Sequence, residues 1–116
     1  MTRALTIAEA AEHTGITTHT LRYYERVGLL APVSRAHSGH RRYGDDDLRM
    51  LDLLKRLQAS GMPIKKMQEF ARLVRSGTIK QRRAALAAHL GDVEEKIREL
   101  KATAALLKKK IARYDA

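Results

Sequence analysis

Residues 19–25, HTLRYYE, place two adjacent tyrosines beside an arginine, in a chain with only four tyrosines and one phenylalanine. If this stretch is helical, Leu21 points inward and Tyr24 lies nearer to it. The outer arc then carries side chains that can donate hydrogen bonds: His19, Arg22, Tyr23 and Arg26. Such a row suits the phosphates and base edges of DNA, because an arginine fork can hold guanine at O6 and N7. The stretch is therefore a candidate DNA-recognition helix.

The composition agrees with a polyanionic partner. The chain has 116 residues, enough for one domain or a small domain with an appendage, and a net charge of +10. A generic solvated basic surface is the alternative explanation of this charge. Cysteine is absent, which excludes disulfides, thiolate metal sites and thiol-based sensing. The N-terminus lacks the apolar region of a signal peptide, and no apolar run approaches membrane-spanning length, so we expect a cytoplasmic protein.

Local signals predict the elements that position the candidate helix. Thr6 and Glu9 form a capping box that begins a helix, and Gly15 is a plausible C-cap. Thr17 or Thr18 then caps a second helix, which ends at Gly28. Two short helices joined by a glycine-containing turn form the outline of a helix-turn-helix.

Residues 29–44, LLAPVSRAHSGHRRYG, interrupt the helices. Pro32 ends any helix, an extended run begins at Val33, and Ser38-Gly39 is a turn dipeptide. Residues 41–43 return from that turn. This pattern predicts a short β-hairpin wing with basic residues on it, which must pack on the helices because it is too short to be stable alone.

A pair of supporting helices follows. Asp45, Asp46 and Asp47 cap the first of them at the positive end of its dipole, and it ends at Gly61. Its apolar stripe consists of Leu48, Leu51, Leu54 and Leu57, with Met50 and Leu53 beside it. Pro63 suits the first turn of the next helix, which runs to Gly77. We expect its apolar residues to belong to the core: Ile64, Met67, Phe70, Ala71 and Val74.

The last part begins at a capping box formed by Thr78 and Gln81. Apolar residues then alternate at spacings of four and three: Leu86, Leu90, Val93, Ile97, Leu100, Ala104, Leu107, Ile111 and Tyr114. This is the period of a coiled coil, and a second copy of the chain is the economical partner. A helix folded back on its own domain is the alternative. The flanking charges leave the pairing direction open, and Gly91 is a possible kink.

No arrangement of residues suggests catalysis or metal binding. The histidines are scattered without ligand spacing: His13, His19, His37, His40 and His89. Paired carboxylates, a Ser/His/Asp set and a phosphate-cradling glycine loop are also missing from the pattern. We therefore expect a protein that is not an enzyme and needs no cofactor. Any small-molecule effector, whose identity the sequence does not indicate, would bind between the coil and residues 48–77 or act through a partner protein.

Several motifs occur in order along the first 75 residues or so: LRYYE, GLL-x-P, SGHRRY and ASGMPIKKM. Together they resemble the MerR family of bacterial transcriptional regulators, and the final coil, ending KKKIARY, resembles the dimerisation helix of that family. The resemblance implies a mainly α fold, with a winged helix-turn-helix and its helical support in residues 1–77 and a long dimerisation helix in residues 78–116. It further implies an antiparallel homodimer on a palindromic operator between the −35 and −10 promoter elements. Bending and untwisting that DNA would let RNA polymerase read both elements.

The resemblance also implies roles for single residues. Arg22 would enter the major groove, Tyr24 would hold a phosphate through its hydroxyl, and Tyr23 would mainly pack, since the family accepts phenylalanine there. Arg35 and Arg41 match backbone-contacting positions of the wing, whereas the family often has tyrosine at the position of His40. The predicted DNA contacts are Thr18, His19, Arg22, Tyr23, Tyr24, Arg26, Arg35, His40, Arg41, Arg42 and Lys66. The predicted dimer contacts are the seam residues given above except Ala104.

Two other functions fit part of this pattern. An architectural or excisionase-like protein would bend DNA without activating transcription, and its sequence would carry the same helix-turn-helix and wing. A coiled-coil adaptor could instead use the basic surface to bind an acidic protein, although the wing motif argues against it.

Overall fold

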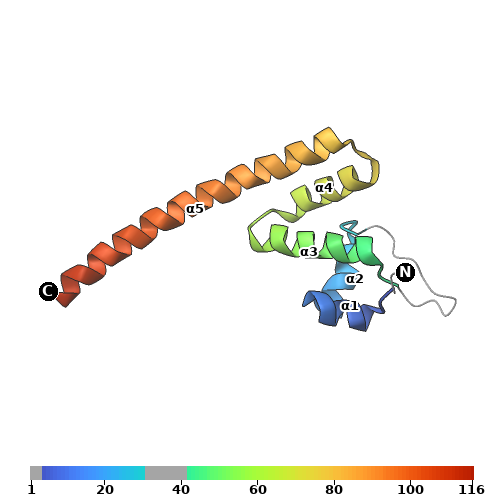
Figure 1. Ribbon diagram of the computed structural model, residues 1–116, viewed down its shortest axis with the longest axis horizontal. Helices are drawn as coiled ribbons and strands as arrows, with labels where there is room; N and C mark the ends of the chain where they lie inside the picture. The colour runs from blue at the N-terminus through green and yellow to red at the C-terminus, as the bar shows by residue number, and fades with distance from the viewer. Residues whose placement is uncertain (1–3, 31–41) are drawn as a thin grey trace. The chain divides into compact units, whose positions relative to one another are not determined.

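The computed structural model describes residues 4–30 and 42–116, most of which are helical (Figure 1). The helices are α1 (Ile7–Thr14), α2 (Thr18–Arg26), α3 (Asp45–Ala59), α4 (Ile64–Ser76) and α5 (Ile79–Asp115). The chain divides into two compact units, Met1–Arg82 and Arg83–Ala116. The mainly α fold is thus confirmed, whereas most of the predicted wing, residues 31–41, lies outside the described residues.

The first two helices begin where the sequence predicts. Thr6 Oγ1 accepts a hydrogen bond from the Glu9 amide at 3.2 Å, and the Glu9 carboxylate accepts one from the Thr6 amide at 3.0 Å. α1 ends at Gly15, whose φ of 75° lies in the left-handed region that glycine adopts without strain. Of the two candidate caps of α2, Thr17 is the one used, because its hydroxyl accepts from the Thr20 amide at 3.1 Å.

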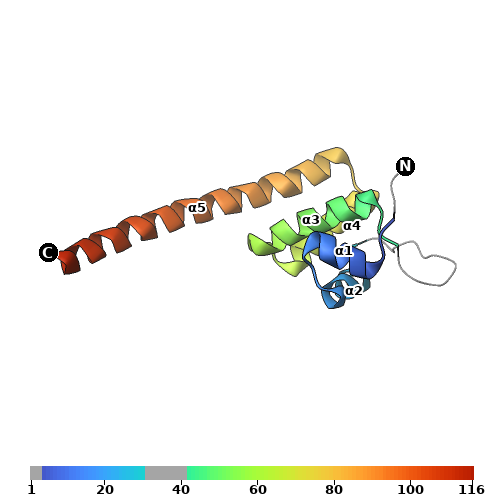
Figure 2. The ribbon, with the colours of Figure 1, turned by 60° about the horizontal axis from the view of Figure 1, so that its bottom comes forward.

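Helix α3 is the centre of the first unit. It packs against α1 on one side and against α4 on another, and α1 also packs against α2. Figures 1 and 2 show the pair α1 and α2 together on one side of α3. The core that these helices enclose consists of Ala10, Ile16, Leu21, Tyr24, Leu29, Leu30, Tyr43, Leu51, Leu54, Leu57, Met62, Met67, Phe70 and Ala71. Burial of such side chains stabilises the unit by roughly 1.5–3 kcal/mol each for the large aliphatic ones.

A short backbone pairing closes the first unit. Leu5 and Tyr43 form an antiparallel bridge, in which each amide donates to the other residue's carbonyl at 2.8 Å. Tyr43 is fully buried, so this bridge attaches the segment before α3 to the segment before α1. The predicted wing therefore has one fixed end at Tyr43.

Two predictions about α4 are wrong in detail. Met67, Phe70 and Ala71 are buried as expected, but Ile64 and Val74 are 41% and 43% exposed. These two side chains lie in the first and last turns of α4, and Val74 borders an open hollow that α3 also lines. Apolar periodicity identifies the inward face of a helix but not how far the neighbouring surface extends along it. Pro63 also precedes α4 as its N-cap instead of lying in its first turn.

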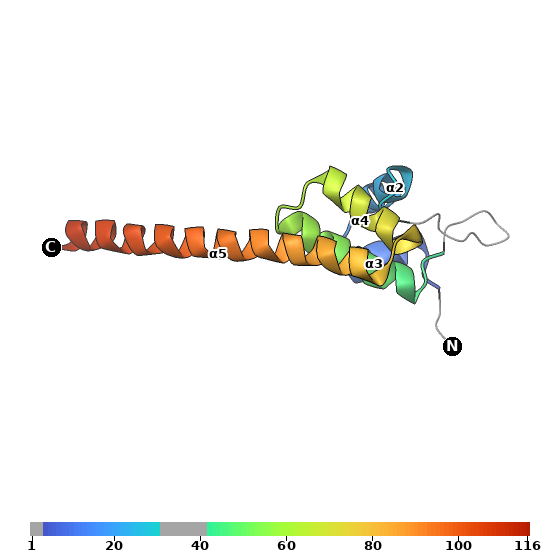
Figure 3. The same ribbon diagram turned by 90° about the horizontal axis from the view of Figure 1, so that it is seen from above.

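Helix α5 is continuous over 37 residues, as Figure 3 shows. Thr78 and Gln81 form the predicted capping box, with hydrogen bonds of 2.9 and 3.1 Å. Gly91 produces no break, and a side chain added there would meet no atom within 4 Å. Over the described residues, no helix combines the length and the apolar content that crossing a membrane requires.

Candidate nucleic-acid interface

The outward face of α2 is basic, as the helical wheel predicts. His19, Arg22 and Arg26 are exposed, whereas Leu21 is fully buried against the core. Leu21 thereby fixes the rotation of α2 about its own axis. Because long side chains at positions i, i+3 and i+7 share one side of a helix, these three residues form a row that can reach a nucleic-acid groove. Thr18, at the first position of α2, is half-buried.

The two tyrosines of α2 are not equivalent. Tyr23 is half-buried, and the Arg26 guanidinium lies 5.4 Å from the centre of its ring. This cation–π contact holds Arg26 along the outer face, although at an exposed site it is worth only about 0.5–1 kcal/mol. Tyr24 is 2% exposed, so the tyrosine whose hydroxyl is predicted to hold a phosphate has the more deeply packed ring of the two. The predicted packing role fits Tyr24 at least as well as Tyr23.

The Tyr24 hydroxyl already has a partner within the chain. It donates a hydrogen bond to Gln58 Oε1 on α3, a residue whose side chain is exposed. Burial of the ring, and secondarily the neighbouring Tyr23, raise the pKa of Tyr24 above its ordinary value of 10.0. The hydroxyl therefore stays protonated as a donor at neutral pH. A contact with a phosphate requires it to leave Gln58, because a hydroxyl has a single proton to donate.

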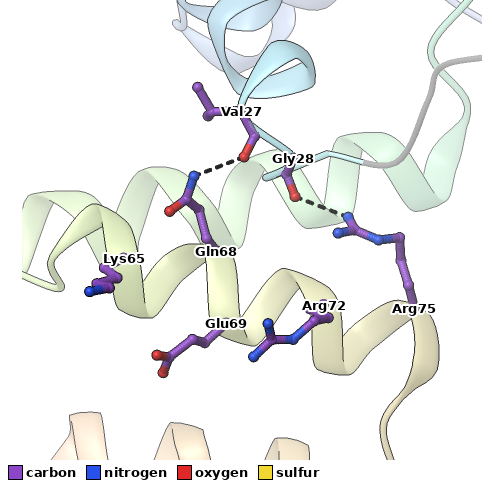
Figure 4. Close-up of a pocket in the computed structure, with 7 residues that line it drawn as sticks. All are labelled: Val27, Gly28, Lys65, Gln68, Glu69, Arg72 and Arg75. Carbon is purple, nitrogen blue, oxygen red and sulfur yellow. Dashed lines mark hydrogen bonds between the residues drawn. The ribbon is translucent and has the colours of Figure 1, made fainter.

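Side chains of α3 and α4 hold the ends of the helix-turn-helix. Lys55 Nζ donates to the Thr14 carbonyl at 2.8 Å, at the C-terminal end of α1. Gln68 Nε2 donates to the Val27 carbonyl at 2.9 Å and Arg75 Nη1 to the Gly28 carbonyl at 3.0 Å, just after α2 (Figure 4). Helix ends leave such carbonyls unpaired and carry partial negative charge, which favours cationic donors.

A basic hollow lies where the end of α2 meets α4. Figure 4 shows its lining residues: Val27, Gly28, Lys65, Gln68, Glu69, Arg72 and Arg75. Its volume is about 350 Å³, and Lys65, Arg72 and Arg75 give it three positive charges against the single carboxylate of Glu69. This hollow extends the positive surface of the first unit from α2 onto α4.

Sequence reasoning missed five of the residues that shape this region. They are Lys65, Gln68, Arg72 and Arg75 on α4 and Gln58 on α3. The spacing of 65, 68, 72 and 75 was a usable signal, since it places these polar residues along one side of α4, next to its buried face. The partnership of Gln58 with Tyr24 left no sequence signal, because 34 residues separate them.

The remaining predicted DNA contacts are only partly placed. Arg35, His40 and Arg41 lie outside the described residues. Arg42 is half-buried next to the bridge at Tyr43, and Lys66 is exposed on α4. The described residues thus bring His19, Arg22, Tyr23 and Arg26 together on α2, and they leave the wing contacts as predictions.

The predicted dimer contacts lie along α5. Leu90, Leu100, Leu107 and Ile111 are between 55% and 69% exposed, Ile97 is 46% exposed and Tyr114 is 78% exposed. Leu86 and Val93 are half-buried. A single chain therefore leaves most of this apolar seam in water, which is the state that an unpaired coiled-coil helix would have.

Comparison with known proteins assigns both units to one kind of protein. A model of the MerR HTH family of regulatory proteins matches residues 5–73, and a model described as MerR, DNA binding, matches residues 48–110. An HTH-type transcriptional regulator from Haemophilus influenzae is 40% identical over 111 residues, which is 94% of this chain and 82% of that protein.

Solved structures give the same result. HiNmlR, described as a MerR family regulator lacking the sensor domain and bound to promoter DNA in its crystal structure, has a TM-score of 0.86 and 39% identity. The alignment covers 99% of this chain and 91% of HiNmlR. A MerR family transcriptional regulator from Listeria monocytogenes has a TM-score of 0.90 and 32% identity, over 97% of this chain and 86% of its own.

Proposed function

The chain belongs to the MerR family of DNA-binding transcriptional regulators, and we propose that it acts as a homodimer on a palindromic promoter operator. Residues 1–77 bind one half-site, and residues 78–116 join the two protomers. The observation that carries this proposal is the exposed basic row on α2, formed by His19, Arg22 and Arg26. HiNmlR, whose structure contains promoter DNA, supports the same mode of binding.

The proposed contacts divide into those that read bases and those that hold the backbone. Arg22, in the middle of the exposed row, enters the major groove and reads a base edge. Tyr24, the wing residues Arg35 and Arg41, and Lys66 contact phosphates, which position the protein but carry no sequence information. The proposed interface also includes Thr18, His19, Tyr23, Arg26, His40 and Arg42.

Activation in this proposal depends on deforming DNA. Two DNA-binding units on one dimer grip the half-sites on both sides of the operator centre, and the phosphate contacts offset the elastic cost of bending and untwisting the duplex between them. The distorted promoter then presents both of its elements to RNA polymerase. We place this activity in the cytoplasm and assign the chain no catalytic reaction.

A random-site DNA selection tests sequence specificity directly. We expect one palindromic site, with affinity that falls steeply with salt concentration because bound phosphates release counterions. Arg22→Ala should relax the preference at one base pair of each half-site, at about 1–3 kcal/mol per contact. Arg98→Ala, which removes the same charge from α5, is the matched control. Equal affinity for every duplex would refute the proposal of a sequence-specific regulator.

Transcription in vitro separates the proposal from DNA bending alone. The family resemblance implies promoters whose −35 and −10 elements lie too far apart for RNA polymerase to read both. On such a promoter carrying the selected site, we expect the protein to increase transcript yield. An architectural or excisionase-like protein would bend the same DNA, as measured by energy transfer between dyes at its ends, and leave the transcript yield unchanged.

A further inference from the structure

The apolar seam of α5 can pair with a second copy in several ways that apolar spacing does not distinguish. Seam residues recur at alternating steps of four and three, so sliding one helix by seven residues, in either direction of pairing, again places seam against seam. The family resemblance implies the antiparallel direction, and among the registers the choice must come from the charged residues beside the seam. The inference below rests on the proposed homodimer.

Each flank of the seam carries its own set of side chains. The residues that follow the seam positions Leu86, Val93, Leu100, Leu107 and Tyr114 are Ala87, Glu94, Lys101, Lys108 and Asp115. The residues that precede the seam positions Leu90, Ile97, Ala104 and Ile111 are His89, Lys96, Thr103 and Lys110. In a parallel pair the two different flanks meet, whereas in an antiparallel pair each flank meets its own copy.

Most arrangements bring like charges together. A parallel pair in register places Lys96 beside Lys101 of the second copy. An antiparallel pair with Leu100 opposite Ala104 places Lys101 beside Lys101 of the second copy, and Lys96 beside its Lys110. An antiparallel pair shifted by one heptad, with Ala104 opposite Leu107, places Lys101 beside Lys108 of the second copy. An antiparallel pair with Val93 opposite Ile97 places Glu94 beside Glu94 of the second copy. Like charges at such positions destabilise a helix pair.

One arrangement has opposite charges and no like-charged lysine or glutamate pair. Here the helices run antiparallel with Ile97 opposite Leu100, so that Glu94 lies beside Lys101 of the second copy, and the symmetry produces this pair twice. Lys96 then faces Thr103. The other seam layers match as well: Leu86 with Ile111, Leu90 with Leu107, and Val93 with Ala104.

Both charged side chains are available for this pairing. Glu94 and Lys101 are exposed, and neither forms an ion pair within the part of the chain that the structure describes. The neighbouring Glu95 does pair with Arg98 at 2.5 Å, on the side of α5 away from the seam. The MerR family itself implies the antiparallel direction; we propose that two copies of α5 adopt this register and that the Glu94–Lys101 pairs specify it.

The absence of cysteine permits a direct test of the register in the full-length chain. We expect Val93→Cys/Ala104→Cys to form a disulfide-linked dimer under mild oxidation. Positions 93 and 104 lie about 16 Å apart along one helix, too far for a bond within a chain. Each single variant should stay uncross-linked, and an equimolar mixture of the two should cross-link. A dimer from Val93→Cys alone, or from Val93→Cys/Ile111→Cys instead, would overturn the register.

Charge reversal tests the specifying pair. Glu94→Lys and Lys101→Glu should each weaken dimerisation about tenfold at low salt, since two attractive contacts become repulsive, and the double variant should restore it to within about threefold. Tighter dimerisation by Lys101→Glu would indicate parallel pairing and overturn the proposal, as would failure of the double variant to restore it. If the unmodified chain sediments as a monomer, the homodimer itself is refuted; a dimer that binds DNA but fails these tests refutes only the register.

Discussion

Tyr24 offers the sharpest test of how the chain uses its recognition helix. Tyr24→Phe removes the hydroxyl that donates to Gln58 Oε1 and keeps the buried ring in place. No cavity forms, and the Gln58 amide, being exposed, is hydrated when it loses its partner. We therefore expect a loss of unfolding free energy near the lower end of the usual range for a hydrogen bond, about 0.5–1 kcal/mol.

The effect on DNA binding follows from the same hydrogen bond. A hydrogen bond to a charged phosphate contributes about 1.5–3 kcal/mol, but the hydroxyl must first give up Gln58, at about 0.5–1.5 kcal/mol. The difference is roughly 1 kcal/mol, so Tyr24→Phe should weaken binding about fivefold per protomer. Because the contact is to the backbone, the loss should be the same for the selected site and for unrelated duplexes.

Gln58→Ala is the matched control, since it removes the same hydrogen bond from the other end. It should lower the unfolding free energy about as much as Tyr24→Phe does, in urea denaturation followed by circular dichroism. In this variant the hydroxyl has no partner to give up, so DNA affinity, measured by fluorescence anisotropy, should hold or rise. If both variants weaken DNA binding equally, the hydroxyl acts only by holding α2 to α3 and the phosphate contact is refuted.

Three further predictions concern stability, each measured by urea denaturation. Gly15→Ala should cost about 1–2 kcal/mol because φ is positive there, whereas Lys55 Nζ, 2.9 Å from the new Cβ, ends a flexible side chain and can shift; an unchanged midpoint would contradict this account of the turn. Thr17→Ala should cost about 1 kcal/mol through loss of the α2 cap, and Thr18→Ala much less; equal losses from the two variants would show that Thr17 alone is not the cap. Because folding raises the pKa of Tyr24, the folded state holds its proton more tightly, so stability should fall as pH rises above about 10, and less so in Tyr24→Phe; the same slope in both would show that Tyr24 does not cause it.

Elements governed by local chemistry could be predicted from the sequence. The capping boxes at Thr6 and Thr78 and the left-handed turn at Gly15 involve residues at most four apart, and each is present as expected. The inward direction of Leu21 followed from helical periodicity for the same reason. Recognition of the family depended on motifs of this short-range kind.

Features that depend on where a neighbouring element ends could not be predicted in this way. Ile64 and Val74 continue the apolar pattern of α4 but stay partly exposed, because they lie in its end turns where the neighbouring elements do not enclose them. The bond between Tyr24 and Gln58 depends on how α2 lies against α3, which no spacing within either helix reveals. The greater burial of Tyr24, in contrast, did follow from spacing within α2, because Tyr24 lies three residues after the buried Leu21 and about 100° from Tyr23.

The way in which α1 and α2 are held has a consequence for protein engineering. Their N-terminal ends are capped by their own threonines, whereas their C-terminal ends depend on Lys55, Gln68 and Arg75, which belong to α3 and α4. A graft of residues 4–30 onto another scaffold would carry the recognition residues but not the side chains that fix their angle. Exchanging operator specificity between relatives therefore calls for transplanting single residues on the outer face of α2, or the whole first unit, and not the helix-turn-helix alone.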